Sequence, residues 1–547
     1  MQDRGNTIIR ATVTSLVVLV ALSAAQAAGA SEDRLIQIPP EPSPEEIYAA
    51  AGVDPDDPHA IWHAALTLLA RHPGAVDVRL PELQRGEMGG AHDQSAAEGT
   101  SRREADPARQ LDLLLRRLGE LGEPQQLPLF FATYARTPWG RWKAYAATQE
   151  IMARSAPANV LREAGRIGSP DPATLATLAF DLEPPVAAAY GRLIREQVEA
   201  NRPGTRAMSP GVLDVWLAWT LAEADPDAAA ELFGRVLQSH DPALRLAGGS
   251  GLMALGRSVP PFRLTAPPEQ TKPQRETWLS TLTPWPLDPF WRPDPLARPF
   301  VQVRRGGRID LVWLNERAEE VRRVDDVWPT VRSVLPDGTF WSLLPTFDWE
   351  TFGLTSPSGE VYARLHDVGY FSQQPLPHGG LLVLTRQQGG HFEEHLPWGG
   401  PPLWALPADD VRIAPIGRGR FLVSGRQGVR ILDRRGDVVA TVPIGEGGVI
   451  GDRHIELVDP DTVLLANQTT IELRKLDGEL LQRHDGFTSI VDVRYQPNGP
   501  WVVLDKGTIA VVLHPTTSER FEFDLSSSND DPPLYSRWKS PNDAFPK

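Results

Sequence analysis

The spacing of apolar positions predicts helices in the first half of the chain. In residues 59–72 and 109–121, apolar side chains recur every three or four positions, which places them on one face of a helix. They are Ile61, Ala65, Leu68 and Leu69 in the first segment, and Leu111, Leu114, Leu115 and Leu118 in the second. Segments of this period continue to Arg257, so residues 44–257 are predicted to form an α-helical repeat domain.

Short polar pairs mark where several of these helices are expected to begin. Aspartate or serine caps the free N–H groups of a helix, and proline suits the first helical position. The pairs are Asp171-Pro172, Ser209-Pro210, Asp225-Pro226 and Asp241-Pro242. Short helices with recurring caps predict stacked helix pairs, a solenoid-like domain. Residues 82–108 have few large apolar side chains, and we expect a flexible loop there.

The segment "DPALRLAGGSGLMALGR", residues 241–257, has two possible interpretations. Gly249, Gly251 and Ala254 match the loose pattern G-x-G-x-x-A of a dinucleotide-binding loop. That loop needs a strand before it and an acidic residue about twenty positions later, whereas an amphipathic helix pattern precedes this segment. We therefore expect a helix whose small-residue face lets a neighbour approach closely. That face comprises Leu244, Gly248, Gly251 and Leu255.

Beyond residue 299 the pattern changes to short runs of Val, Ile, Leu and Trp between turns. Related turns recur at intervals of 41, 40, 43 and 37 residues. Their anchor positions are Pro336, Pro377, Gly417, Pro460 and Pro497. Four short strands in about forty residues are typical of one β-propeller blade, so residues 300–525 are predicted to form a β-propeller of about six blades. A β-sandwich is the alternative, but its strands need not repeat at fixed intervals.

Residues 258–299 separate these two parts. They contain eleven prolines together with Trp278, Trp285, Phe290 and Trp291. Proline favours extended chain, and so many aromatic side chains are unusual in a flexible linker. We expect an extended connecting strap packed on one or both domains, with a peptide-docking surface as the alternative. The polar residues 526–547 are predicted to form a disordered tail.

Charge and composition exclude several classes of partner and site. The formal net charge is −15, which disfavours nucleic acid and anionic membrane surfaces. The chain has no cysteine, so disulfides, thiolate metal sites and cysteine nucleophiles are excluded. No motif for a cofactor is present, and we predict none.

The N-terminal residues have the pattern of a secretory signal peptide. Arg4 and Arg10 precede an apolar run, and small-x-small sites follow at residues 25–27 and 28–30. We expect residues 1–27 to be removed, with cleavage near Ala28 or Ser31. The alternative is an uncleaved membrane anchor. The mature chain is expected to be a soluble periplasmic or extracellular protein without a membrane span.

One short motif suggests metal chemistry. His391, Glu394 and His395 form H-x-x-E-H, a pattern in which two histidines on a helix bind zinc and the glutamate acts as base. Glycine pairs flank the motif, which leaves no room for a helix, and no third ligand is identified. A charged blade loop is the favoured interpretation, and no metal is predicted.

Other polar residues are expected to be structural. Aspartate stabilises turns through its own backbone, and this role is predicted for Asp337, Asp433, Asp461 and Asp477. Three histidines near blade loops are expected to be solvated, with a place in a central pocket as the alternative: His366, His378 and His484.

Two family resemblances follow from these segments. Residues 241–257 resemble the second helix of a HEAT-type repeat, and residues 225–245 resemble a tetratricopeptide unit; both types are mostly protein-binding scaffolds. Residues 352–385 resemble blades of PQQ-type, NHL-type and arylsulfotransferase propellers. The last family has a histidine pair before the anchor turn. This chain has Tyr370 and Phe371 there, and Trp328 and Pro329 in the preceding unit.

The sequence therefore favours an exported binding or scaffolding protein over an enzyme. Propellers bind at the mouth of the central channel and solenoids on their concave face, so a protein or peptide partner is expected. The alternative is an arylsulfotransferase-like or carbohydrate-active enzyme with its site in the channel. Three or more converging His, Arg, Asp or Glu side chains at the channel mouth would favour the enzyme, whereas a merely charged or apolar rim would favour binding.

Overall fold

A computed structural model describes the chain in segments. They are residues 44–72, 107–127, 131, 138–167, 170–200, 210–256, 258–287, 300–305, 308–327, 331–334, 339–343, 352–356, 360–365, 373–376, 380–385, 391–396, 405–407, 412–416, 420–425, 428–432, 438–445, 447–459, 461–495 and 499–525. The predicted signal peptide, the loop up to residue 106 and the tail lie outside them. The chain divides into two compact units, Met1–Ala50 and Ala51–Lys547. The predicted domain boundaries at 257 and 299 stay predictions.

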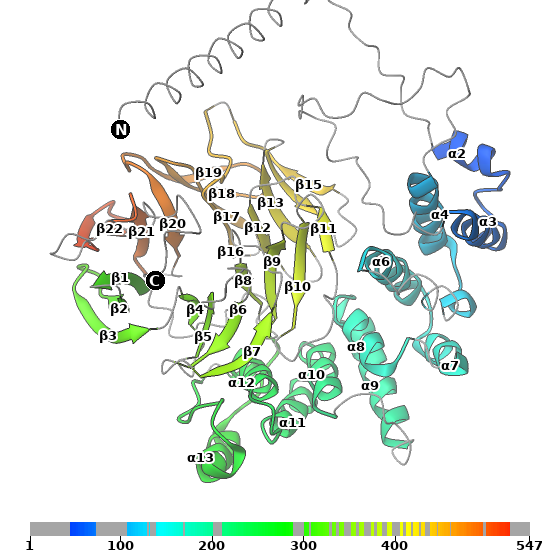
Figure 1. Cartoon of the computed structure of the whole chain (residues 1–547), viewed down its shortest axis with the longest axis horizontal. Helices are drawn as coiled ribbons and strands as arrows, with labels where there is room; N and C mark the ends of the chain where they lie inside the picture. The colour runs from blue at the N-terminus through cyan, green and yellow to red at the C-terminus, as the bar shows by residue number, and fades with distance from the viewer. Residues whose placement is uncertain are drawn as a thin grey trace, which may run out of the picture. The chain divides into compact units, whose positions relative to one another are not determined.

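The first part of the described chain is helical, as predicted (Figure 1). Its elements are α2 (Pro44–Ala51), α3 (Pro58–Arg71), α4 (Pro107–Leu121), η3 (Pro124–Gln126), α6 (Pro138–Arg154), α7 (Pro157–Ile167), α8 (Pro172–Phe180), α9 (Pro184–Ala200), α10 (Pro210–Leu221), α11 (Pro226–Val236), α12 (Pro242–Gly256) and α13 (Pro268–Thr281).

Every helix that the structure describes begins at a proline. The proline ring has a helical φ angle, and the first residues of a helix need no N–H donor. The preceding aspartate often completes the start: Asp171 Oδ1 accepts hydrogen bonds from the backbone N–H groups of Ala173 and Thr174 at 2.9 and 3.1 Å. The side chains of Asp225 and Asp241 accept similar bonds, so the caps predicted at these three positions are confirmed.

Between α3 and α12, helices pack on others that are near them in chain order, and α12 confirms the helical interpretation of the glycine-rich segment. Residues 242–256 are one buried helix that packs on α11. A Cβ atom on Gly251 would overlap with the ring of Phe233 on α11, and one on Gly248 would lie 2.9 Å from the carbonyl oxygen of Phe233. The glycines therefore allow close helix packing, and the segment is not a dinucleotide-binding loop.

The connecting strap is not extended throughout, which corrects that expectation. Residues 268–281 form α13, with Pro268 at its first position and Pro273 inside it. Trp278 is buried, donates from Nε1 to Ser258 Oγ at 3.0 Å, and meets the ring of Phe262 edge-on. Burial of this indole stabilises the helix despite the proline. As predicted, the strap packs on the helical domain, since Leu264 contacts Gly249 of α12.

The second part of the described chain consists of antiparallel sheets formed by consecutive strands. The first sheet contains β1 (Phe300–Arg305), β2 (Arg308–Leu314) and β3 (Glu320–Val327). The second sheet contains β4 (Val331–Val334), β5 (Phe340–Leu343), β6 (Phe352–Thr355) and β7 (Val361–Leu365). The third contains β8 (Gln373–Pro375), β9 (Leu381–Thr385), β10 (His391–His395) and β11 (Ala405–Pro407).

Three further four-stranded sheets follow. They contain β12 (Arg412–Pro415), β13 (Phe421–Gly425), β14 (Gly428–Leu432), β15 (Val438–Val442); β16 (His454–Asp459), β17 (Thr462–Ala466), β18 (Ile471–Lys475), β19 (Leu480–His484); and β20 (Ile490–Arg494), β21 (Trp501–Asp505), β22 (Ile509–Leu513), β23 (Arg520–Asp524). The short runs of Val, Ile, Leu and Trp expected between turns are strands where the structure describes them, for example in β2, β13, β14, β17 and β21.

Neighbouring sheets share apolar cores. Leu422 and Ile431 of the β12–β15 sheet pack with Leu457 and Val463 of the β16–β19 sheet, and the latter sheet packs in the same way on β20–β23. The first sheet also packs on the last. Val301 and Val312 join Val502 and Val512 in one core, and His514 Nε2 lies 2.8 Å from the carbonyl oxygen of Glu316. Consecutive meanders packed face to face are the arrangement of β-propeller blades.

Candidate functional site

Charged side chains gather on the first strands of three successive sheets. Along β16 and β20, buried apolar residues such as Ile455, Leu457 and Val493 are separated by polar ones, because successive strand residues point to opposite faces. Five of the charged side chains on β12, β16 and β20 interact with one another. We call them the central cluster: Arg412 from β12, His454 and Glu456 from β16, and Asp492 and Arg494 from β20. In Figure 1 the first strands lie toward the middle of the group of sheets.

His454 lies between two carboxylates. Its Nε2 is 3.2 Å from Oε2 of Glu456, and its Nδ1 is 3.3 Å from Oδ1 of Asp492. Arg494 Nε approaches the other oxygen, Oδ2, of Asp492 at 3.0 Å. A carboxylate only accepts hydrogen bonds, so two such neighbours require that both ring nitrogens of His454 donate. The geometry therefore favours a protonated imidazole.

The electrostatics agree with this geometry. Burial would lower the pKa of His454, but hydrogen bonds to Asp492 and Glu456 and their negative charges raise the pKa to about 9. Burial would raise the pKa of Asp492, but Arg494, His454 and Arg412 hold the pKa of this carboxyl well below its usual range. At neutral pH the imidazole is thus a cation between two anions.

The cluster remains partly accessible. Side-chain exposure is 18% for His454, 15% for Glu456, 31% for Asp492 and 30% for Arg494. The guanidinium carbon of Arg494 lies 4.9 Å from the centre of the Phe300 ring, a cation–π contact with β1 of the first sheet. The site therefore joins residues from both ends of the sheet region.

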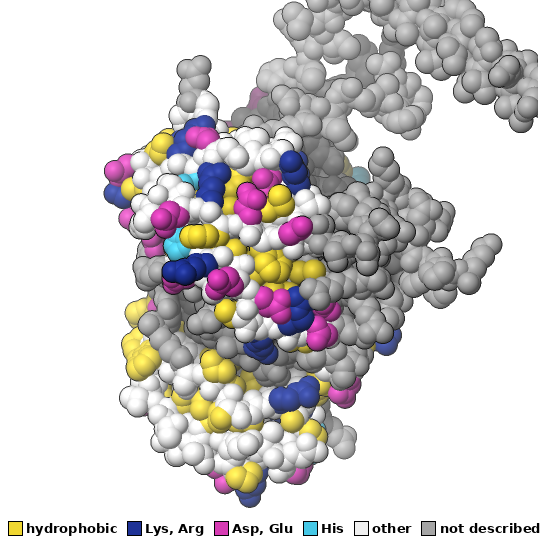
Figure 2. All heavy atoms as spheres, turned by 90° about the vertical axis from the view of Figure 1, so that its left-hand side faces the viewer, with side chains coloured by type: hydrophobic (Ala, Val, Ile, Leu, Met, Phe, Trp, Pro, Cys, Tyr) yellow, Lys and Arg dark blue, Asp and Glu magenta, His cyan; other side chains and the backbone are white. Residues whose placement is uncertain are grey.

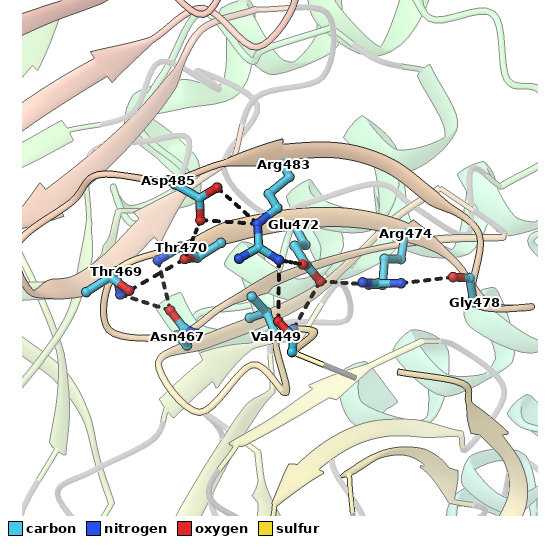
Figure 3. Close-up of polar contacts among 10 residues, drawn as sticks. Val449, Asn467, Thr469, Thr470, Glu472, Arg474, Gly478, Arg483 and Asp485 are labelled. Atoms are coloured by element: carbon cyan, nitrogen blue, oxygen red, sulfur yellow. Dashed lines mark hydrogen bonds and ion pairs between the residues drawn. The ribbon is translucent and has the colours of Figure 1, made fainter. Parts of the chain in front are cut away.

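A second polar network lies in the β16–β19 sheet around the buried carboxylate of Glu472 (Figure 3). Glu472 on β18 is fully buried and accepts from Arg474 Nε at 2.7 Å, Arg483 Nη1 at 2.8 Å and the backbone N–H of Val449 at 3.1 Å. Arg483 also binds Asp485 at 3.0 Å. This network links β18 and β19 to the segment after β15, so its role is structural.

The structure places the predicted metal candidates on strand β10. Glu394 is buried and shares a face with buried Phe392, whereas His395 shares the other face with Glu393 and lies 2.8 Å from its Oε2. Alternation puts position 391 on the face of His395, but the side chain of His391 lies outside the described part. Glu394 is thus on the opposite face from both histidine positions. Within the described ranges, no three His, Cys, Asp or Glu residues are arranged to hold a metal.

The remaining predicted positions have various outcomes. Asp477 Oδ1 accepts from the N–H of Glu479 at 3.0 Å, so Asp477 has the predicted role in its turn. At the turn before β17 the accepting side chain is that of Asp459, which binds the N–H of Asp461 at 3.0 Å. The expectation of a solvated loop histidine is wrong for His484, which is buried against Trp501 at the end of β19. Burial lowers the pKa of His484. Further positions named in the sequence analysis lie outside the described residues, among them Ser209, Phe290, Trp291, Trp328, Pro329, Asp337, His366, Tyr370, Phe371, His378 and Asp433.

Sequence reasoning missed the central cluster. The available signal was the presence of charged residues in the strand before three anchor turns, at Gly417, Pro460 and Pro497. Across these repeats the polar positions carry opposite charges. No helix of the described part is long and apolar enough to cross a membrane.

Comparisons with known proteins found distant structural similarities. No family model matches the chain, and no curated protein matches it. A protein of unknown function from Bacteroides caccae shares 16% identity, over 32% of this chain and 69% of that one, with a TM-score of 0.26. BamB from Moraxella catarrhalis shares 12% identity, over 42% of this chain and 69% of that one, with a TM-score of 0.24. The C-terminal WD40 domain of Sif2 shares 10% sequence identity, over 42% of this chain and 69% of that one, with a TM-score of 0.27. Similarity at this level does not specify a shared function or site.

Proposed function

We propose that this chain is an exported, soluble binding or scaffolding protein that recognises a protein or peptide partner. Its sheets form a closed six-bladed propeller, and its helices form a HEAT-like or tetratricopeptide-like array. The apolar run after Arg4 and Arg10 supports export. The partner contacts the mouth of the propeller and the helical surface.

The contact between the first and last sheets supports the closed propeller. Val301 and Val312 share a core with Val502 and Val512, although about two hundred residues separate the two pairs. The described part contains six antiparallel sheets in chain order. Closure removes long exposed strand edges and leaves the first strands around a common centre.

The state of His454 is the observation that favours binding over catalysis. A general base works best with a pKa near the operating pH, and it needs an unprotonated nitrogen. His454 has both nitrogens next to carboxylates and a pKa raised to about 9. The central cluster is thus a set of mutually compensated charges rather than a poised acid–base pair.

Crosslinking and mass spectrometry on the native envelope fraction test this function. We expect one partner protein in stoichiometric amount, and an N-terminus of the recovered chain at Ala28 or Ser31. Recovery without any crosslinked protein would contradict the scaffold role. An unprocessed N-terminus in the cytoplasmic fraction would contradict export.

An enzyme with its site at the centre is the second candidate, because His454, Glu456, Asp492 and Arg494 converge there. Convergence of this kind meets the criterion set above for catalysis. Turnover assays with aryl sulfates and with glycosides compare the two candidates. If the purified chain turns over one of these substrates and His454→Gln abolishes that turnover, the chain is an enzyme. If the chain is a binding protein, we expect no turnover.

A further inference from the structure

We propose that the outer edge of β15 binds an extended segment of the partner protein as an additional strand. The segment has an uncharged run of β-branched or apolar residues, as long as β15 itself, between basic residues. This inference rests on the proposed function and specifies which part of the partner is recognised. Three features support it: the open edge of β15, the lack of charge along this strand, and the charge of the whole chain.

The first feature is the open edge of β15. This strand is the last in the sheet order β12-β13-β14-β15, and the described residues place no strand on its other side (Figure 1). The four residues from Val438 to Thr441 are exposed, and Val438 and Val439 are each 52% exposed. An edge strand presents unpaired backbone N–H and C=O groups, so a further strand can pair with it.

The second feature is the absence of charge on β15. Proteins protect the edges of sheets with charged side chains, with proline or with very short strands. The other last strands that the structure describes carry such residues: Arg323 in β3, Arg364 in β7, Pro407 in β11, Arg483 in β19 and Arg520 in β23. The sequence of β15 is Val-Val-Ala-Thr-Val, without charge or proline. Its edge is therefore unprotected.

Equivalent positions in the sheets make this difference specific. In β3, β7, β15 and β19 the second residue of the strand is skipped in the pairing with the neighbouring strand: Val321, Tyr362, Val439 and Leu481. Two positions later β3, β7 and β19 have arginine, at 323, 364 and 483, whereas β15 has Thr441. Of these four strands, β15 alone lacks the charge that opposes addition of a strand.

The exposed side chains of β15 specify the chemistry of the bound segment. Strand addition forms main-chain hydrogen bonds and places side chains of the added strand beside those of the edge strand. β-Branched and apolar side chains can pack on Val438 and Val439. A charged side chain there would lose hydration, and β15 offers no charge to compensate it. The paired run is therefore uncharged.

The third feature is the charge of the whole chain, which specifies the residues that flank this run. The formal net charge is −15, and Figure 2 shows acidic and basic side chains interspersed over the described part of one face. Two copies of a chain with this charge repel each other, whereas a basic partner is attracted. The observations thus favour a segment of another protein with basic flanks over a second copy of this chain.

Matched peptides test the proposal on the purified full chain by fluorescence anisotropy. The first probe is labelled Lys-Val-Thr-Val-Thr-Val-Lys amide. The second carries N-methyl groups on the central valine and the threonine after it, which blocks hydrogen bonding along both edges of the peptide. We expect the first to bind at least about tenfold more tightly, because the second loses main-chain hydrogen bonds. Equal affinity would overturn the proposal, and so would tighter binding of a peptide with Glu in place of both Lys residues.

Variants locate the site. Val439→Glu should weaken binding of the first peptide at least about threefold, although it adds a negative charge that attracts lysine. Leu481→Glu is the matched control, since Leu481 has the equivalent position in β19 and is 41% exposed. It should leave the affinity unchanged. Thr441→Glu is the second test if Val439→Glu does not fold. Unchanged affinity in folded Val439→Glu or Thr441→Glu would overturn the proposal.

Sedimentation velocity tests the alternative occupant, a second copy of the chain. We expect a monomer, because the net charge of −15 opposes association. A dimer that Val439→Glu dissociates and Leu481→Glu does not would overturn the proposal, since the edge of β15 would then pair with its own copy.

The outcomes separate this inference from the proposed function. If crosslinking recovers a partner but the first peptide does not bind better than its N-methylated form, the inference is wrong and the binding role stands. If the peptide binds at β15 but the native fraction yields no protein partner, the edge site stands and the scaffold role is wrong.

Discussion

Replacing Gly251 by alanine tests the packing of α12 on α11. In a helix interior alanine is more favourable than glycine by about 1 kcal/mol. The new Cβ, however, would overlap with the ring of Phe233, which is fully buried and held edge-on by Trp219 at 5.2 Å. Overpacking of this kind costs about 1–3 kcal/mol. We therefore expect Gly251→Ala to lower the free energy of unfolding by about 1 kcal/mol net.

Gly165 provides the matched control. It also lies in a helix, α7, but nothing lies within 4 Å of its missing Cβ. Gly165→Ala should therefore raise the free energy of unfolding by about 0.5–1 kcal/mol. Urea unfolding followed by far-ultraviolet circular dichroism measures both variants. If Gly251→Ala stabilises the chain as much as Gly165→Ala does, the close approach of α11 and α12 is wrong.

Three further substitutions test the polar groups. Glu472→Gln should lower the free energy of unfolding, measured with urea, by about 3 kcal/mol, because it leaves two arginines without their buried anionic partner. The control Glu479→Gln removes an exposed ion pair and should lower it by less than about 1 kcal/mol. Asp171→Ala should cost about 1 kcal/mol in the same assay through loss of the α8 cap, and no loss would contradict the cap. The pKa of His454 is about 9 in the folded chain, against 6.5 for a histidine in the unfolded chain. His454→Gln should therefore lower the free energy of unfolding most below pH 6.5, and this loss should shrink as the pH rises from 6.5 to 9. A cost that grows with pH in unfolding measured across this range would contradict the two ion pairs.

The helices and most strands follow from local chemistry. Asp-Pro pairs specify helix starts because the cap and the fixed φ angle act within four residues, as at Asp171 and Asp225. Apolar runs such as 462–466 are buried on both faces, so their strand character is evident without the fold. The strap was harder to predict, since burial of Trp278 outweighs the helix-breaking effect of Pro273, and burial depends on tertiary packing.

The central cluster required the fold. Arg412, His454 and Asp492 are about forty residues apart in sequence, and each is an ordinary polar residue of a short strand. Only the packing of successive sheets brings them together. The motif at residues 391–395 is the opposite case, because its residues are adjacent in sequence but alternate between the two faces of β10.

Closure of the first sheet on the last is the claim on which the rest depends. The chain has no cysteine, so the double substitution Glu316→Cys and His514→Cys introduces its only two thiols. The two positions are 198 residues apart in sequence, but the side chain of His514 is in hydrogen-bond contact with the backbone oxygen of Glu316. We predict that a short bismaleimide joins them within one molecule, seen as faster migration of the denatured monomer and one crosslinked peptide by mass spectrometry. Each single-cysteine variant is the control. Failure of the folded double variant to crosslink, while both thiols react singly, would contradict the closed arrangement.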